Sequence, residues 1–417
     1  MHNFNYRRYA AGGVVSNTGT WMQRVAQDWL VLQLTANSAL AIGITTGLQF
    51  LPFLLLSPLA GLVADRVDKR RLLQITNIAM AVPALLLGGL AVSGAAEIWH
   101  VYVLAFVLGT AAAFDAPARA AFVSEIVGPE DLTNAVGLNS ASFNAARLVG
   151  PAAAGLMIAA LGGGAVATGW VILINAFTYL GPLIALRSMD PTRLTTPRPQ
   201  AREPRMIRAG IGYVRRRPDL VLIMMIVFSA GTFGMNFQMT SALMATEVFD
   251  KGATEFGLLG TCLAVGSLAG SLLAASRTRV RLRMVVAAAL AFALIEVCAG
   301  LTPSFLAFAL VAPLLGLAAL TMITTATSYI QLHTDPRVRG RVMALYLMIF
   351  MGGTPVGSPM IGWLGEAFGA RWTLLLGGAL TALGVMVAVA FYWRREPAAV
   401  RPRRRLPEPG TPLVDAA

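Results

Sequence analysis

The chain has 417 residues, of which 56% are hydrophobic and only 13% are charged. Soluble domains carry about 25% charged residues, so this composition excludes an ordinary soluble domain. The net charge of +13 would suggest nucleic acid in a soluble protein, but here the basic residues gather in loops and termini. The two cysteines, Cys262 and Cys298, lie in separate apolar runs, and their spacing predicts neither a disulfide nor a redox or metal site.

Apolar runs of about 20 residues recur along the chain, and each can cross roughly 30 Å of hydrocarbon. Only helices fit this run length, so we expect an all-α polytopic membrane protein. Nothing at the N-terminus resembles a cleaved signal peptide, and the first run, which contains Arg24 and Asp28, is expected to be a retained helix. Twelve transmembrane helices are predicted, at residues 10–34, 38–62, 72–93, 99–123, 134–161, 166–187, 219–246, 255–276, 284–302, 304–330, 341–364 and 372–393.

A basic connector divides six predicted spans from six. Matching residues recur in the two halves at offsets of 207 or 208: Leu108 with Leu315, Pro129 with Pro336, and Pro151 with Pro359. Such an internal repeat predicts two pseudo-symmetric six-helix bundles with a binding site at their interface near the bilayer midplane. The predicted domains are an N-terminal bundle at 1–187, a cytoplasmic linker at 188–218, a C-terminal bundle at 219–393 and a disordered cytoplasmic tail at 394–417.

Basic residues mark one side of the membrane. All but four of the 33 lysines and arginines fall in the termini and in alternate loops. Arg24 and Arg147 lie inside spans, and only Lys251 and Arg371 lie on the other side. This asymmetry predicts that both termini are cytoplasmic, in an inner or plasma membrane. The segment 206–217 is expected to be a basic amphipathic helix on the inner leaflet.

The stretch from Gly61 to Arg71 lies between two apolar runs and is too charged for lipid, so we expect a tight cytoplasmic turn. Gly61 is expected to allow close packing where the second helix ends. The dipole of a helix that begins near Gly340 would stabilise the Asp65 carboxylate by about 0.3–1 kcal/mol if the carboxylate lay beside the N-terminus of that helix. If this contact forms only when the cytoplasmic side is closed, Asp65 acts as a conformational latch. The alternative is a basic loop that only fixes topology.

The first predicted helix carries two charges, Arg24 and Asp28, and each costs about 2.5–3.5 kcal/mol near the membrane centre. They must therefore face a cavity or a partner. Since they are four residues apart, they share a helix face and could pair. Burial favours a neutral, proton-carrying Asp28, whereas Arg24 favours an ionised one, and both alternatives stay open. A coupling cycle could also work by moving Arg24 or Arg147 away from Asp28.

The fifth predicted helix carries small residues and a proline, which allow close helix contact and a bend. The residues are Gly137, Ala146, Gly150, Pro151, Ala154 and Gly155. Arg147 lies in the middle of this pattern and could pair with Asp28, receive an anionic group of a substrate, or be a structural counter-ion.

Three further charges lie inside predicted spans. Asp115 and Arg119 flank Pro117 toward the cytoplasmic end of the fourth helix, where snorkelling lowers their cost. Asp115 is a further candidate for proton coupling. Glu296 is alone in the ninth helix, which we expect to be peripheral, so a snorkelling side chain is favoured over a coupling site.

Polar, methionine and aromatic side chains suit a cavity for amphipathic ligands, although the same residues are common in plain helix packing. The substrate-cavity candidates are Trp21, Gln23, Gln27, Asn144, Phe233, Asn236, Phe237, Gln238, Thr324, Tyr346 and Phe350.

Several short sequence segments resemble those of the major facilitator superfamily, in particular of its enterobactin-exporter-like branch. The loop Gly61–Arg71 resembles the family's Gly-x-x-x-Asp-Arg/Lys-x-Gly-Arg/Lys-Arg/Lys motif, with Asp68 in place of a glycine. The fifth helix resembles the antiporter motif Gly-x8-Gly-x3-Gly-Pro-x-x-Gly-Gly, with alanine at two glycine positions. Further matches are Gln23-Arg24-x-Ala26-x-Asp28-Trp29, Leu51-Pro52-Phe53, Ala116-Pro117-Ala118-Arg119 and Leu138-Asn139-Ser140.

The resemblance implies a monomeric secondary transporter that works by alternating access, with a small-molecule substrate and protons as partners in the lipid bilayer. It implies proton-coupled antiport that exports an amphipathic drug, siderophore or secondary metabolite. It also implies a latch network of Gly61, Asp65, Arg66, Lys69, Arg70 and Arg119. Two alternatives remain: proton-coupled or facilitated metabolite uptake, and a non-transporting membrane sensor or assembly factor.

Enzymatic features are not found in the sequence. It contains no Gly-x4-Gly-Lys-Ser/Thr loop, so no ATP site of the common type is expected. The three histidines are scattered, and no nucleophile–base pattern is recognisable. We expect no enzyme, cofactor, metal site or nucleic-acid partner.

Overall fold

The computed structural model describes residues 3–190, 192, 194, 206–275 and 280–395, and every regular element in them is helical. The first six spans comprise α1 (Phe4–Leu34), α2 (Ala39–Arg66), α3 (Lys69–Val92), α4 (Ile98–Ile126), α5 (Pro129–Ala160), and α6 (Ala165–Thr178) continued by α7 (Leu180–Arg187). Ser38 caps the start of α2, and Asp68 caps the start of α3 by accepting from the Arg70 and Arg71 N–H groups.

The later spans include two that are broken. The seventh runs through α9 (Pro218–Ser229), the π-helix η2 (Ala230–Gly234), α10 (Phe237–Leu243) and the π-helix η3 (Met244–Val248). The eleventh consists of α14 (Pro336–Gly352) and α15 (Thr354–Phe368). The others are α11 (Ala253–Ala275), α12 (Leu282–Gly300), α13 (Phe305–His333) and α16 (Ala370–Arg395).

Eleven helices of the described chain are long and apolar enough to cross a membrane. The remaining span, α1, is 31 residues long but too polar in composition to be counted with them. Large apolar side chains on the outer faces are exposed, for example Ile75 at 62%, Leu294 at 65% and Leu310 at 67%. Such continuous apolar surface fits contact with lipid.

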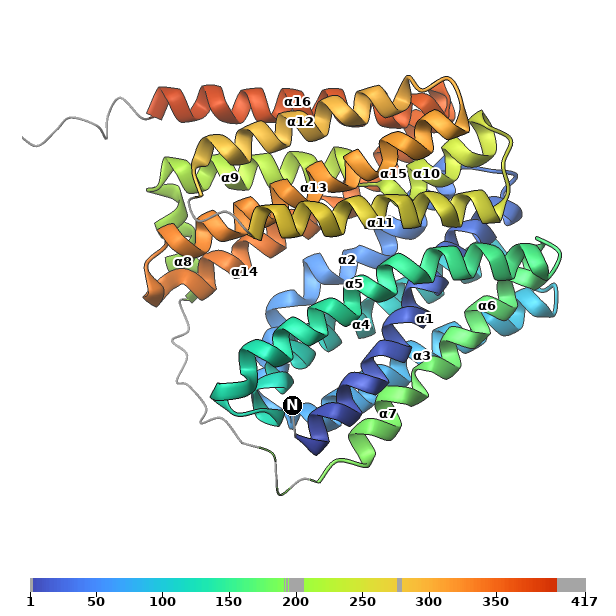
Figure 1. Ribbon diagram of the computed structural model, residues 1–417, viewed down its shortest axis with the longest axis horizontal. Helices are drawn as coiled ribbons and strands as arrows, with labels where there is room; N and C mark the ends of the chain where they lie inside the picture. Colours follow the sequence, from blue (N-terminus) through green and yellow to red (C-terminus); the bar gives the residue numbers. More distant parts are fainter. Residues whose placement is uncertain (1–2, 191, 193, 195–205, 276–279, 396–417) are drawn as a thin grey trace, which may run out of the picture.

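The helices form two bundles, one of α1–α7 and one of α9–α16 (Figure 1). In the first, α1 packs on α5, α2 on α4 and α3 on α6. In the second, α11 packs on α13 and α12 on α16. The expected fold of two six-helix bundles is therefore confirmed, whereas the exact division of the chain at 187 and 219 stays a prediction.

The most extensive contacts between the bundles are those of α2 with α15 and of α5 with α11. A Cβ on Gly257 of α11 would collide with the Pro151 carbonyl, so this glycine is needed for the close approach. Farther along, Ser38 donates a hydrogen bond to the Glu366 carboxylate at 3.1 Å. We call the end of the molecule at which α1 begins and α2 ends the basic end. The two bundles diverge toward it (Figure 1), and these contacts lie in the other half.

The amphipathic linker helix is found as α8 (Met206–Arg215), which packs on α14 and α9, and its place on the inner leaflet stays a prediction. Two expectations are wrong. Gly61 was expected to permit close packing, yet a Cβ added there would meet no atom within 4 Å. The tail was predicted to be disordered from residue 394 on, but Arg394 and Arg395 still belong to the last helix, α16. The rest of the predicted tail, from residue 396 on, lies outside the described residues.

Candidate functional site

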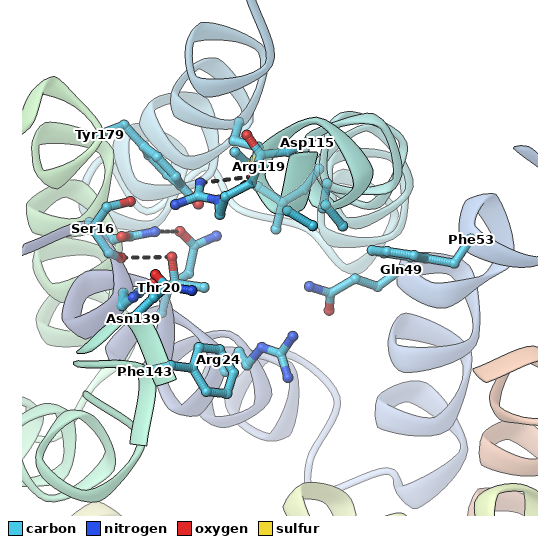
Figure 2. Close-up of a pocket in the computed structure, with 18 of the residues that line it drawn as sticks. Ser16, Thr20, Arg24, Gln49, Phe53, Asp115, Arg119, Asn139, Phe143 and Tyr179 are labelled. Atoms are coloured by element: carbon cyan, nitrogen blue, oxygen red, sulfur yellow. Dashed lines mark hydrogen bonds and ion pairs between the residues drawn. The ribbon is translucent and has the colours of Figure 1, made fainter. Parts of the chain in front are cut away.

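Two cavities share one residue, Arg24. The first, of about 480 Å³, lies within the first bundle (Figure 2). Its polar lining includes Ser16, Asn17, Thr20, Gln23, Arg24, Gln27, Gln49, Asp115, Arg119, Asn139, Ser140, Asn144, Asn175 and Tyr179. The second, of about 240 Å³, lies between the bundles and is lined by Trp21, Arg24, Phe50, Arg147, Pro151, Gly231, Met235, Asn236, Phe237, Gln238, Ser241, Phe256, Phe350 and Thr354, among others.

An ion pair forms one wall of the first cavity. Arg119 donates to the Asp115 carboxylate at 2.8 Å, one helical turn away on α4 (Figure 2). Thr76 of α3 donates to the other oxygen of Asp115, also at 2.8 Å. Both charged side chains were expected to snorkel toward the membrane surface, but Asp115 is only 5% exposed and lines the cavity inside the bundle. Its negative charge is compensated within the bundle.

Amide side chains form the rest of the polar wall. The Asn175 amide of α6 donates to Gln23, and the Gln27 amide donates across to Gln49 of α2 at 3.3 Å. Asn144 donates to the Ser140 carbonyl at 2.8 Å. The expected cavity residues Gln23, Gln27 and Asn144 therefore do line a cavity, whereas Gln49 and Asn175 were not singled out in the sequence because isolated amides carry no spacing signal.

Two arginines approach one indole ring. The Arg24 guanidinium lies 4.9 Å from the centre of the Trp21 ring, and that of Arg147 lies 5.5 Å from it. Phe50 of α2 is 5.9 Å from Arg24. Neither arginine forms an ion pair with any carboxylate in the described ranges. The place where the cavities meet therefore carries two positive charges that contact aromatic rings, whose faces attract cations.

Asp28 pairs with neither arginine. It is 5% exposed and lines neither cavity. The structure does not bring Arg24 and Asp28 into the ion pair that their spacing allows, because Arg24 turns toward Trp21 and Phe50. Arg147 does not pair with Asp28 either. Within the described residues, Asp28 is a buried acid that forms no ion pair.

The second bundle contributes the broken seventh span to the cavity between the bundles. The predicted cavity residues Asn236, Phe237, Gln238 and Phe350 line it. The predicted residues Phe233, Thr324 and Tyr346 line neither cavity. Tyr346 is 1% exposed and stacks on Phe350 with ring centres 6.2 Å apart, so it supports the cavity wall from behind.

The residues of the basic loop hold the first bundle together at the basic end. Lys69 at the start of α3 pairs with Glu125 near the end of α4 at 2.6 Å. Arg70 donates to the Leu186 carbonyl of α7 at 2.7 Å. Asp65 and Arg66 are exposed. Arg119 pairs with Asp115, and a latch contact of Asp65 with the start of α14 stays a prediction.

The motif of the fifth helix coincides in part with the contact between the bundles. Gly150 lies against Trp21, and Pro151 and Gly155 lie against α11. Ala146 and Ala154 are buried at 2% and 0% exposure. At Gly137, by contrast, an added Cβ would meet no atom within 4 Å, so packing does not explain a glycine there.

Glu296 differs most from its expectation. It is 0% exposed, so it does not snorkel from a peripheral helix. Neither of its carboxyl oxygens has a hydrogen-bond partner among the described residues. Sequence reasoning missed its burial because the helices that cover it, η2 and α16, are remote in the chain. No group of three or more His, Cys, Asp or Glu that could hold a metal is found in the described part of the chain.

The chain matches a family model over nearly its whole length. The family is described as transmembrane secretion effector, and residues 3–416 match it. The staphyloferrin A transporter of Staphylococcus aureus is 24% identical over 90% of this chain and 92% of its own. The multidrug efflux pump Tap of Mycolicibacterium fortuitum is 28% identical over 89% and 92%. The macrolide efflux protein A of Streptococcus pyogenes is 23% identical over 85% and 89%.

Solved structures agree on the fold. A bacterial homologue of the human lysosomal transporter Spinster, inward-facing and unoccupied, has a TM-score of 0.70 at 15% identity over 94% of this chain and 97% of that one. A D-xylose–proton symporter has a TM-score of 0.71 at 13% identity over 94% and 98%. Identities this low show the fold alone. The family match and the transporter relatives identify the chain as a membrane transporter rather than an enzyme, and it belongs to the transmembrane secretion effector family of the major facilitator superfamily.

Proposed function

We propose that this transporter exports an amphipathic small molecule across the plasma membrane in exchange for protons. The observation that carries the proposal is the cavity between the bundles, which both bundles line with aromatic, methionine and amide side chains and with two arginines. A cavity of this composition suits a ligand with both apolar and polar parts. The names of three relatives, a siderophore transporter and two efflux proteins, support a cargo of this kind.

The proposed mechanism is alternating access by a monomer, in which the bundles at 1–187 and 219–393 rock against each other about the linker at 188–218. The basic end is assigned to the cytoplasm by its arginines and lysines, together with both termini. The contacts of α2 with α15 and of α5 with α11 close the other end. The arrangement would then be open to the cytoplasm, ready to accept cargo from inside the cell.

Asp28 is the proposed proton carrier in the first bundle. Burial disfavours the ionised form of Asp28 and the charge of Arg24 favours it, so movement of Arg24 relative to Asp28 would change its affinity for a proton. Asp115 is a weaker candidate, since Arg119 and Thr76 already stabilise its ionised form. Release of the Asp28 proton would require water or a cation to reach it, which a change in bundle position can provide.

The test is proton flux in proteoliposomes under an imposed pH gradient, with a panel of amphipathic compounds. We expect compound-dependent flux in the intact protein and its loss in Asp28→Asn. The matched control is Glu130→Gln, which removes an exposed acid at the start of α5 and should leave flux unchanged. Flux that survives in Asp28→Asn would exclude this residue as the carrier. Accumulation of compound on the cytoplasmic side would instead favour uptake, and absence of both flux and binding would favour a non-transporting role.

A further inference from the structure

Glu296 lies in a niche that is shaped by two glycines. A Cβ on Gly234 of η2 would lie 2.8 Å from one carboxyl oxygen of Glu296, and a Cβ on Gly377 of α16 would lie 3.0 Å from the other. The hydroxyl oxygen of Thr381 borders the same space, 2.9 Å from the Gly234 position. Any larger residue at either glycine would displace the carboxyl. The niche therefore accommodates a carboxyl group between α12, η2 and α16.

The niche offers this carboxyl no charge partner. Both Glu296 oxygens and the Thr381 hydroxyl are buried without a hydrogen bond to any described residue. Arg371 of α16 donates hydrogen bonds from its guanidinium to the carbonyls of Gly300 and Thr302 at 2.9 and 2.7 Å. Helix α12 packs against α9, α13 and α16. Apart from the exposed Cys298, the other titratable or charged groups on these four helices lie toward the basic end. They are Arg283, Asp219, Tyr329, His333, Tyr392, Arg394 and Arg395.

These surroundings decide the protonation of Glu296 in this conformation. An ionised carboxylate with neither donors nor a cation is strongly disfavoured in an apolar interior. The neutral acid avoids most of this cost. The neutral acid therefore fits this niche, and ionising it requires the niche to open to water or to a donor.

The segment that covers the niche is also a wall of the cavity between the bundles. Gly231, Met235 and Asn236 line that cavity, whereas Gly234 faces Glu296. The span is irregular at this point: η2 is a π-helix, and the helix is interrupted at Met235 and Asn236. Such irregular turns in helices often occur at functional sites.

Asn236 holds the interruption in place. Its amide donates to the carbonyls of Thr232 and Phe233, both at 3.2 Å, and its carbonyl oxygen accepts from Ser358 of α15 at 2.6 Å. These bonds link η2 to α15, the helix that contacts the first bundle. A shift of η2 would thus alter the niche, the cavity wall and the contact between the bundles together.

We propose that Glu296 is a proton-binding site whose occupancy is coupled, through η2 and Asn236, to occupancy of the cavity between the bundles. With the proton bound, η2 closes over the niche as in this structure. Loss of the proton requires η2 to rearrange, which changes the cavity wall at Gly231, Met235 and Asn236. A compound that prefers one arrangement of this wall shifts the protonation equilibrium, and the proton shifts compound binding reciprocally. The part of Glu296 in antiport rests on the proposed function, but proton binding there does not.

The first experiment labels the intact protein in proteoliposomes with dicyclohexylcarbodiimide, which reacts with protonated carboxyls in apolar surroundings. Mass spectrometry of peptides measures labelling at Glu296, with the exposed Glu247 as an internal control. We expect labelling of Glu296 but not Glu247, falling about tenfold per pH unit once Glu296 ionises. A transported compound should change the labelling rate. Absence of labelling at Glu296 across acidic and neutral pH would overturn the inference.

The second experiment compares Glu296→Gln with the matched control Glu247→Gln. Glutamine mimics the neutral acid, so Glu296→Gln should fold, keep compound binding and lose compound-driven proton flux, while the control keeps both. If Glu296→Gln shows the same proton flux as the wild type, the proposed role of Glu296 is refuted, whereas the proposed antiport is not. Conversely, compound-sensitive labelling of Glu296 in a protein that shows no flux would preserve the site and refute antiport. If the variant does not fold, the labelling of the intact protein remains decisive.

Discussion

The Arg24 guanidinium lies 4.9 Å from the centre of the Trp21 ring, although an acid, Asp28, is four residues away on the same helix. Arg147 approaches the same ring from α5 at 5.5 Å. Both arginines border the cavity between the bundles. An anionic group of a substrate could therefore bind between the two guanidinium groups.

Substitution of these arginines should change selectivity by charge. In Arg24→Gln or Arg147→Gln, transport of a compound with a carboxylate should weaken by about 10- to 100-fold, since a hydrogen bond to a charged group contributes about 1.5–3 kcal/mol. The methyl ester of the same compound should be affected little. The measurement compares concentration dependences for acid and ester, with Arg371→Gln as a control outside both cavities. Equal losses for acid and ester would refute an anion site.

The pair of Asp115 and Arg119 should behave as a coupled unit in stability. Asp115→Asn leaves a largely buried guanidinium without its carboxylate and should lower the free energy of unfolding by about 1–3 kcal/mol. Arg119→Gln in the same protein should recover part of the loss. Thermal unfolding in detergent of both single variants and the double variant gives the coupling energy. Additive effects would show that the contact contributes nothing.

The two bundles are in contact at the end of the molecule that lies opposite the basic end, and we expect this contact to depend on Gly257. In Gly257→Leu the new side chain would collide with the Pro151 carbonyl and should separate α5 from α11. The matched control is Gly137→Leu on α5, where a side chain meets open space. In a background without Cys262 and Cys298, the thiol introduced by Phe256→Cys should react with a membrane-impermeant reagent faster in Gly257→Leu than in the control. Unchanged reactivity would contradict a closing role for this contact.

The proposed latch can be tested with two neighbouring aspartates. Asp65→Asn should weaken the state that is closed at the basic end by about 0.3–1 kcal/mol, a two- to fivefold change in population. Asp68→Asn keeps a capping oxygen at the start of α3, since asparagine caps helices about as well as aspartate, and should leave this population unchanged. The readout is labelling of the thiol introduced by Ser140→Cys, at a position that lines the first cavity. Faster labelling in Asp65→Asn alone supports the latch, and equal rates in both variants contradict it.

The number of spans could be predicted because each span is a run of apolar residues of fixed minimum length. The breaks in the seventh and eleventh spans could not, because glycine and proline occur throughout membrane helices, as Pro83 inside the regular α3 shows. The broken turns at Gly234 and Gly353 are determined by what packs on them. Gly353, for instance, lies against Thr232 of η2.

The residue types of the candidate site could be predicted better than their pairings. Trp21, Asn236 and Phe350 line the cavity as expected, since polar and aromatic residues inside a span need an inward partner. The rotation of a helix that is apolar on every face cannot be read from the sequence, so Thr324 was misplaced. Glu296 was misjudged for the same reason, because the niche that buries it is formed by glycines of other helices.

The polar character of α1 has a consequence for synthesis of the protein. Arg24 and Asp28 each cost about 2.5–3.5 kcal/mol at the membrane centre, so this helix cannot partition into lipid on its own. Its main packing partners, α5 and α6, follow more than ninety residues later in the chain. This span leaves the ribosome before the helices that cover its charges, so its stable insertion depends on helices that are made later.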